Sequence, residues 1–139
     1  MKTAIRYYTR SGNTKKLADA IGTALSLSAE TVDVPLTEKA DLLLIGCSYY
    51  AFDMDPQVKA FLKENKDRIG KVACFGTSAM IKSMKKPMKK VLDELGIALL
   101  EDEFHCPGSF GPMHKGKPDA ADLKAVQRFA VKLAAKESK

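Results

Sequence analysis

The run Leu42-Leu43-Leu44-Ile45-Gly46 is the feature that most restricts the fold of this chain. Its side chains are apolar at consecutive positions, whereas a strand with one face in water alternates apolar and polar residues. A continuous run therefore predicts a central parallel strand that is covered on both faces by helices. The run is also far shorter than the roughly 20 residues that a membrane-spanning helix needs.

Apolar strand-like runs alternate with amphipathic helical patterns along the whole chain, without a repeat, a low-complexity tract or a linker. This pattern predicts one domain over residues 1–139. The expected strands are 4–8, 31–34, 42–46, 71–75 and 97–106, and the expected helices begin at Lys15, at Pro56, near Pro87 and at Ala120. Right-handed crossovers would wind these units into an α/β fold, a three-layer doubly wound five-stranded parallel sheet of order 2-1-3-4-5.

The hexapeptide Thr9-Arg10-Ser11-Gly12-Asn13-Thr14 separates the first expected strand from the first helix. It offers hydroxyl groups, an amide and a glycine that permits a sharp turn, and it contains no carboxylate. The N-terminus of a helix presents N–H groups that bind anions. The segment is therefore predicted to cradle a phosphate group.

The net charge of +6 is accompanied by a dense lysine stretch at Lys82, Lys85, Lys86, Lys89 and Lys90. This stretch contains no interleaved aromatic residues and no recognised nucleic-acid motif, so we expect no nucleic-acid partner. A solvated helix face is the favoured interpretation, and attraction to an acidic protein or a phosphorylated cosubstrate is the alternative.

The three cysteines, Cys47, Cys74 and Cys106, are odd in number and lack C-x-x-C spacing. They are expected to be buried free thiols rather than a disulfide framework or a zinc site. The N-terminus lacks an apolar signal segment, and no apolar run is long enough to span a membrane. The chain is accordingly expected to be cytoplasmic, with no membrane partner.

Several phosphate-binding classes are excluded by their motifs. The chain has no G-x-x-x-x-G-K-S/T sequence, and no G-x-G-x-x-G follows its first strand, so the P-loop and dinucleotide fingerprints are missing. A response regulator needs acidic residues at the strand ends, where this chain has Tyr8-Thr9 and Cys47-Ser48. A cysteine phosphatase needs an arginine six residues after its cysteine, and Asp53 stands there after Cys47.

The remaining motifs resemble those of the flavodoxin-like family over essentially the whole chain. Residues 9–14 fit its Ser/Thr-x-Ser/Thr-Gly-Asn-Thr motif, and residues 46–62 fit the loop and helix that follow its third strand. The segment Phe75-Gly76-Thr77-Ser78-Ala79 corresponds to its second flavin-contacting loop. Residues 104–110 match the F-x-C-x-G-x-F pattern near the end of short members.

The resemblance implies an FMN site built from three loops. The first would hold the phosphate, the second would stack on the flavin ring through Tyr50 or Phe52, and the third would supply backbone groups to its pyrimidine edge. The implied cofactor-binding residues are Thr9, Arg10, Ser11, Gly12, Asn13, Thr14, Ser48, Tyr49, Tyr50, Ala51, Phe52, Gly76, Thr77, Ser78 and Ala79.

The resemblance implies electron transfer to a redox partner protein or a small electron acceptor, by a monomer or a homodimer. Two alternatives stay open, an FMN-dependent NAD(P)H:quinone-type reductase and a flavodoxin-fold interaction protein without flavin.

Two residue-level features also bear on the function. Arg10 stands where relatives place a small polar residue, and His105 and His114 are isolated, which fits surface or strand-end positions better than catalysis.

Overall fold

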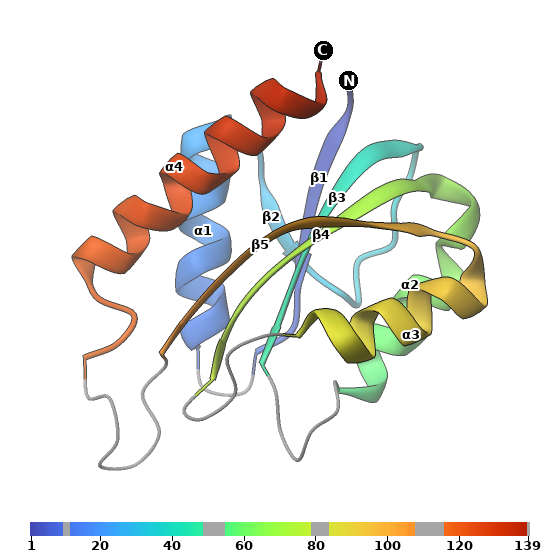
Figure 1. Ribbon diagram of the computed structural model, residues 1–139, viewed down its shortest axis with the longest axis horizontal. Coiled ribbons are helices and arrows are strands. Elements are labelled where there is room, and N and C mark those ends of the chain that lie inside the picture. Colours follow the sequence, from blue (N-terminus) through green and yellow to red (C-terminus); the bar gives the residue numbers. More distant parts are fainter. Residues whose placement is uncertain (10–11, 49–54, 79–83, 108–115, 139) are drawn as a thin grey trace.

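A five-stranded parallel sheet forms the middle layer of the structure (Figure 1). The computed structural model describes residues 1–9, 12–48, 55–78, 84–107 and 116–138. The sheet has the order β2-β1-β3-β4-β5, so the predicted order 2-1-3-4-5 is confirmed. Its strands are β1 (Thr3–Tyr7), β2 (Ala29–Thr31), β3 (Ala40–Ser48), β4 (Ile69–Ser78) and β5 (Ala98–Pro107).

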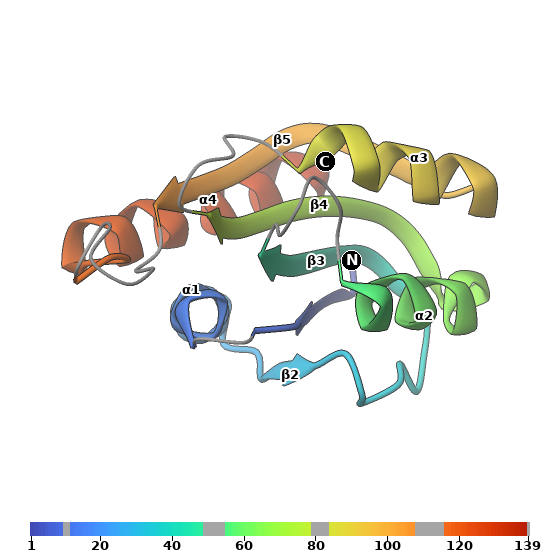
Figure 2. The ribbon, with the colours of Figure 1, turned by 90° about the horizontal axis from the view of Figure 1, so that it is seen from below.

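Two helices cover each face of the sheet (Figure 2). Helices α1 (Asn13–Leu25) and α4 (Ala120–Glu137) lie on one face. Helices α2 (Pro56–Glu64) and α3 (Lys85–Leu95) lie on the other, and a 3-10 turn at Lys66–Arg68 connects α2 to β4. Within the described ranges, no helix has the length and apolarity needed to cross a lipid bilayer.

The side chains of β3 divide between the two core clusters. Leu42 and Leu44 pack towards α1 and α4, while Leu43 and Ile45 pack towards α2 and α3. All four are fully buried. Each such side chain contributes about 1.5–3 kcal/mol when it leaves water, so a strand that is apolar at every position belongs in the centre of the sheet. This is the position that the sequence predicts.

Helix α2 begins where the sequence places its start. Asp55 is the N-cap, and its Oδ1 accepts a hydrogen bond from the backbone N–H of Gln57 at 2.9 Å. Pro56 occupies the first helical position, where its missing N–H removes no helical hydrogen bond. The cap fixes the direction in which the chain enters α2 after the second predicted site loop.

Replacing Asp55 with alanine is expected to lower the free energy of unfolding by about 1 kcal/mol, because the Gln57 N–H loses its acceptor. Urea denaturation followed by circular dichroism measures this change. Asp55→Asn retains a side-chain oxygen at the cap and is the matched control. Equal losses in the two variants would mean that the charge of Asp55, and not the cap, is what matters.

Strand β2 lies earlier in the chain than predicted. It pairs Ala29 with Ile5 and Thr31 with Tyr7, and the chain then turns, with the N–H of Val34 donating to the carbonyl oxygen of Thr31 at 3.1 Å. The β-branched Val32 and Val34 had favoured a strand over 31–34. Instead, the carbonyl groups of Val34 and Pro35 accept hydrogen bonds from the buried guanidinium of Arg6, at 2.9 and 3.3 Å. These backbone groups are thus satisfied outside the sheet.

Two helix starts also differ from prediction. Helix α1 begins at Asn13 rather than Lys15, and α3 begins at Lys85, so that Pro87 is its third residue. The first four N–H groups of a helix have no intrahelical acceptor, so proline within this turn breaks no hydrogen bond. The predicted end of α3 is confirmed, since Gly96 follows it in a left-handed conformation with φ of 72°.

Candidate functional site

The carboxyl ends of β1, β3 and β4 meet at one edge of the sheet (Figure 1). In this register Tyr7 lies opposite Gly46, and Ser48 lies opposite Thr77. The three predicted loops follow these strands, so the expectation that they share one edge is confirmed. In open parallel sheets, the crevice between strands whose connections leave in opposite directions is where ligands bind, and here β1 and β3 border it.

Gly12 forms the turn into α1. Its φ of 90° lies in the left-handed region that only glycine adopts readily, and a Cβ there would meet no atom within 4 Å. Its N–H donates to Oγ1 of Thr9 at 2.9 Å, and its carbonyl oxygen accepts from the N–H of Lys16 at 3.2 Å. Glycine is therefore required here by the backbone conformation rather than by crowding.

The N-terminus of α1 carries the positive end of the helix dipole at this edge. Its N-cap residue is Gly12, which has no side chain, and its first turn contains no acidic residue. Asn13 and Thr14, which begin the helix, are buried. These properties suit an anionic ligand, as the sequence predicts for residues 9–14.

Thr14 joins the first predicted loop to the third. Its hydroxyl oxygen lies 3.4 Å from that of Thr77 at the end of β4, and both residues are buried. The two positions are 63 residues apart in the chain. The contact holds the start of α1 against the middle of the sheet.

Gly46 permits this close approach of α1. A Cβ at Gly46 would lie 2.4 Å from the Phe75 ring and 3.0 Å from Cγ2 of Thr14. The aromatic ring of Phe75 thus occupies the space that a larger residue in β3 would need. Phe75 is fully buried, which places an apolar floor beneath the start of α1.

Gly76 is surrounded by the neighbouring strand and by the residue before α3. A Cβ there would lie 2.1 Å from the carbonyl oxygen of Cys47 and 2.4 Å from Cε of Met84. Met84 is held in turn by two contacts: its Sδ accepts from the Cys47 thiol at 3.3 Å, and its N–H donates to Oε2 of Glu103 at 2.8 Å. These contacts hold the start of α3 against β3 and β5, the two strands that flank β4.

His105 lies in β5 directly opposite Gly76. It is half-buried, and within the described part of the chain its Nε2 is buried without a hydrogen-bond partner. Burial lowers the pKa of His105, although Glu103 opposes the shift. The predicted strand-end position of this histidine is confirmed, and its imidazole favours the neutral form.

The three cysteines are buried free thiols, as predicted. Burial raises the pKa of Cys47 to about 12, and the acidic groups of Glu103 and Asp55 act in the same direction. Burial likewise raises the pKa of Cys106 to about 12 and raises that of Cys74 well above its ordinary value. The raised pKa values disfavour the thiolate, which is the reactive form of cysteine, at neutral pH.

The structure places eight of the predicted site residues at this edge: Thr9, Gly12, Asn13, Thr14, Ser48, Gly76, Thr77 and Ser78. Arg10, Ser11, Tyr49, Tyr50, Ala51, Phe52 and Ala79 lie outside the described residues, as does His114. Sequence reasoning placed Phe75 in the segment that corresponds to the second flavin-contacting loop, but it did not identify Met84 as a neighbour of the site. The apolar character of Met84 signalled burial only, and no local pattern links Met84 to Gly76.

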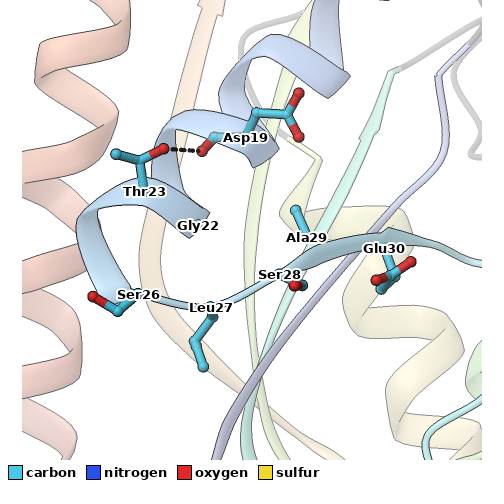
Figure 3. A pocket seen from close by; sticks show the side chains of 8 residues that line it. All are labelled: Asp19, Gly22, Thr23, Ser26, Leu27, Ser28, Ala29 and Glu30. Atoms are coloured by element: carbon cyan, nitrogen blue, oxygen red, sulfur yellow. Dashed lines mark hydrogen bonds between the residues drawn. The ribbon is translucent and has the colours of Figure 1, made fainter.

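A separate shallow pocket lies at the opposite edge of the sheet (Figure 3). It is formed by the last turns of α1 and the start of β2, and Thr23 on its rim donates its hydroxyl to the carbonyl oxygen of Asp19 at 3.1 Å. No predicted site residue lines it. The pocket is therefore distinct from the candidate site.

The strand order and the glycine-led helix N-terminus at the carboxyl edge define a flavodoxin-like fold. The family described as "Flavodoxin domain" matches residues 4–139, and the chain belongs to this family. A comparison with curated protein sequences found no significant match.

Solved structures agree with this assignment. A flavodoxin from the domain Archaea has a TM-score of 0.77 and 23% identity, with 100% of both chains covered. Oxidised flavodoxin 1 from Bacillus cereus has a TM-score of 0.68 and 19% identity, covering 97% of this chain and 98% of the other. A flavoprotein in complex with FMN from Lactobacillus acidophilus has a TM-score of 0.59 and 23% identity, covering 75% of this chain and 91% of the other. At these identities the similarity shows the fold.

Proposed function

We propose that the protein binds FMN at the carboxyl edge of its sheet and transfers electrons to a partner protein or a small acceptor. The observation that carries the proposal is the N-terminus of α1, which follows a left-handed Gly12 at the carboxyl edge of the sheet and has no acidic residue in its first turn. A phosphate group fits such a helix end. Membership of the flavodoxin domain family and the FMN complex of a structural neighbour support the same cofactor.

Different residues would contact different parts of FMN. The N-terminus of α1 and the hydroxyl of Thr14 would hold the phosphate, and Gly76 would supply backbone groups beside the flavin. Tyr50 and Phe52 stay the proposed stacking residues. FMN itself supplies the redox chemistry by accepting and donating electrons, so the site needs no nucleophile. The protonated thiols of Cys47, Cys74 and Cys106 fit this requirement.

Titration of the flavin-free protein with FMN and with riboflavin tests the proposal. The two ligands differ by the phosphate, so we expect FMN to bind at least about 100-fold more tightly, since charge-assisted hydrogen bonds are worth about 1.5–3 kcal/mol each. Quenching of flavin fluorescence measures both affinities. Failure to take up FMN would instead support the interaction protein without flavin, and equal affinities would contradict the phosphate cradle.

The choice between carrier and reductase needs a second assay on the FMN-loaded protein. A carrier is expected to bleach near ~450 nm only when a partner reductase is supplied together with NADPH. Bleaching by NADPH alone in a stopped-flow instrument would identify the reductase instead. The two results are distinguished by omitting the partner.

A further inference from the structure

The order of charges along α3 opposes the preference of helix ends. Acidic side chains stabilise the N-terminus of a helix and basic ones its C-terminus. Helix α4 follows this rule, with Asp122 in its first turn and Lys136 in its last. Helix α3 reverses it, with all its lysines within residues 85–90 and its two acidic residues at positions 93 and 94. This order of charges does not stabilise the helix, so the fold by itself gives no reason for the concentration of lysines at its N-terminal half.

Three exposed residues of α3, Lys86, Lys89 and Lys90, form what we call the α3 lysine patch. Lys86 and Lys90 are four residues apart and share one face, opposite the buried Met88. Within the described ranges neither of them forms an ion pair. Lys89 contacts Asp93 at 2.9 Å, but both side chains are more than half exposed, so water screens the pair.

The patch lies within the most basic part of the chain. Between Asp67 and Asp93 there is no acidic residue, whereas seven basic ones occur: Arg68, Lys71, Lys82, Lys85, Lys86, Lys89 and Lys90. Their number exceeds the net charge of the whole chain, +6. Because α3 follows the loop after β4, its lysine-rich half begins at the sheet edge that holds the candidate site (Figure 1).

We propose that the α3 lysine patch is a docking surface for an acidic protein that exchanges electrons with the candidate site. The electron exchange rests on the proposed function, whereas the docking itself does not. A concentrated positive surface attracts a negative partner and increases its rate of association. Helix α3 contains no aromatic side chain on which a base could stack, which favours a protein over a single-stranded nucleic acid.

Charge reversal on two opposite helices tests the docking surface. The first variant, K86E/K89E/K90E, reverses the α3 lysine patch. The second, K124E/R128E/K132E, reverses three exposed basic residues of α4 on the other face of the sheet and changes the net charge equally. The probe is an immobilised plant-type ferredoxin with an acidic surface, and binding of the purified full-length chain is measured by biolayer interferometry at about 20 mM salt.

We expect the α3 variant to bind the ferredoxin at least about tenfold more weakly than the unaltered protein, and the α4 variant less than about threefold more weakly. Equal losses in both variants would overturn the proposal, because net charge alone would then explain binding. Tighter binding of a single-stranded RNA than of the ferredoxin, lost in the α3 variant, would also overturn it.

Circular dichroism and melting temperature serve as the folding check. The α3 variant is expected to keep the helical signal of the unaltered protein and to melt slightly lower, because K89E and K90E place acidic side chains four residues before Asp93 and Glu94. The FMN titration separates the two proposals. Normal FMN binding with no difference between the variants refutes only the docking surface, whereas selective loss of ferredoxin binding without FMN uptake refutes only the proposed cofactor.

Discussion

Replacing Gly76 with alanine is expected to lower the free energy of unfolding by about 3 kcal/mol or more. The added Cβ would lie 2.1 Å from the backbone oxygen of Cys47, in the adjacent strand β3. A flexible side chain such as that of Met84 moves aside readily, but a carbonyl group held within a central sheet does not. The strands must therefore separate at the edge where the site lies.

Urea denaturation of Gly76→Ala and Gly96→Ala measures this effect against a matched glycine. A Cβ at Gly96 would have no atom within 4 Å. Gly96→Ala therefore measures only the strain of a side chain on a left-handed backbone, with φ of 72°. That strain costs about 1–2 kcal/mol. Equal losses of stability in the two variants would mean that the crowding around Gly76 has no energetic consequence.

Replacing Thr14 with valine is expected to weaken FMN binding by about 10- to 100-fold, equivalent to about 1.4–2.8 kcal/mol. Valine has nearly the shape of threonine but lacks the hydroxyl, which we propose contacts the phosphate. Riboflavin has no phosphate, so its affinity is expected to stay unchanged. Fluorescence titration of both ligands against both proteins isolates the interaction between the hydroxyl and the phosphate.

Thr77→Val is the control for Thr14→Val. Both variants remove the contact between the two hydroxyl groups, which lie 3.4 Å apart, but only the first removes the hydroxyl on α1. The two variants are therefore expected to lose similar stability and to differ in their preference for FMN over riboflavin. An equal loss of that preference would assign the effect to the broken contact rather than to the phosphate.

Sequence patterns predicted the elements whose position depends on neighbouring residues in the chain. The unbroken apolar run identified β3, and Asp55-Pro56 and Gly96 marked a helix start and a helix end because capping depends on nearby residues. The position of β2 escaped prediction because it depends on Arg6, 28 residues before its acceptor Val34. Valine at alternating positions indicates a strand, and no local pattern shows that a guanidinium will take up the carbonyl groups.

At the candidate site, too, the local turn could be predicted from the sequence and the long-range contacts could not. The turn at Gly12 was predictable, since its residues are contiguous and lead directly into a helix. The long-range contacts at this edge of the sheet were not predictable, because they join residues far apart in the chain, such as Thr14 with Thr77 and Met84 with Glu103. Gly76 was expected to supply backbone groups to a ligand, and the structure adds that packing against Cys47 also requires glycine there.

The raised pKa values of the buried thiols slow the oxidation of these cysteines. Reduced flavins react with oxygen to form hydrogen peroxide, and peroxide attacks a thiolate to start the oxidation of cysteine. With Cys47 and Cys106 held at pKa values of about 12, almost no thiolate exists at neutral pH. With the FMN that we propose bound at the carboxyl edge, the cysteines of the core are therefore expected to resist the peroxide that the reduced flavin forms in air.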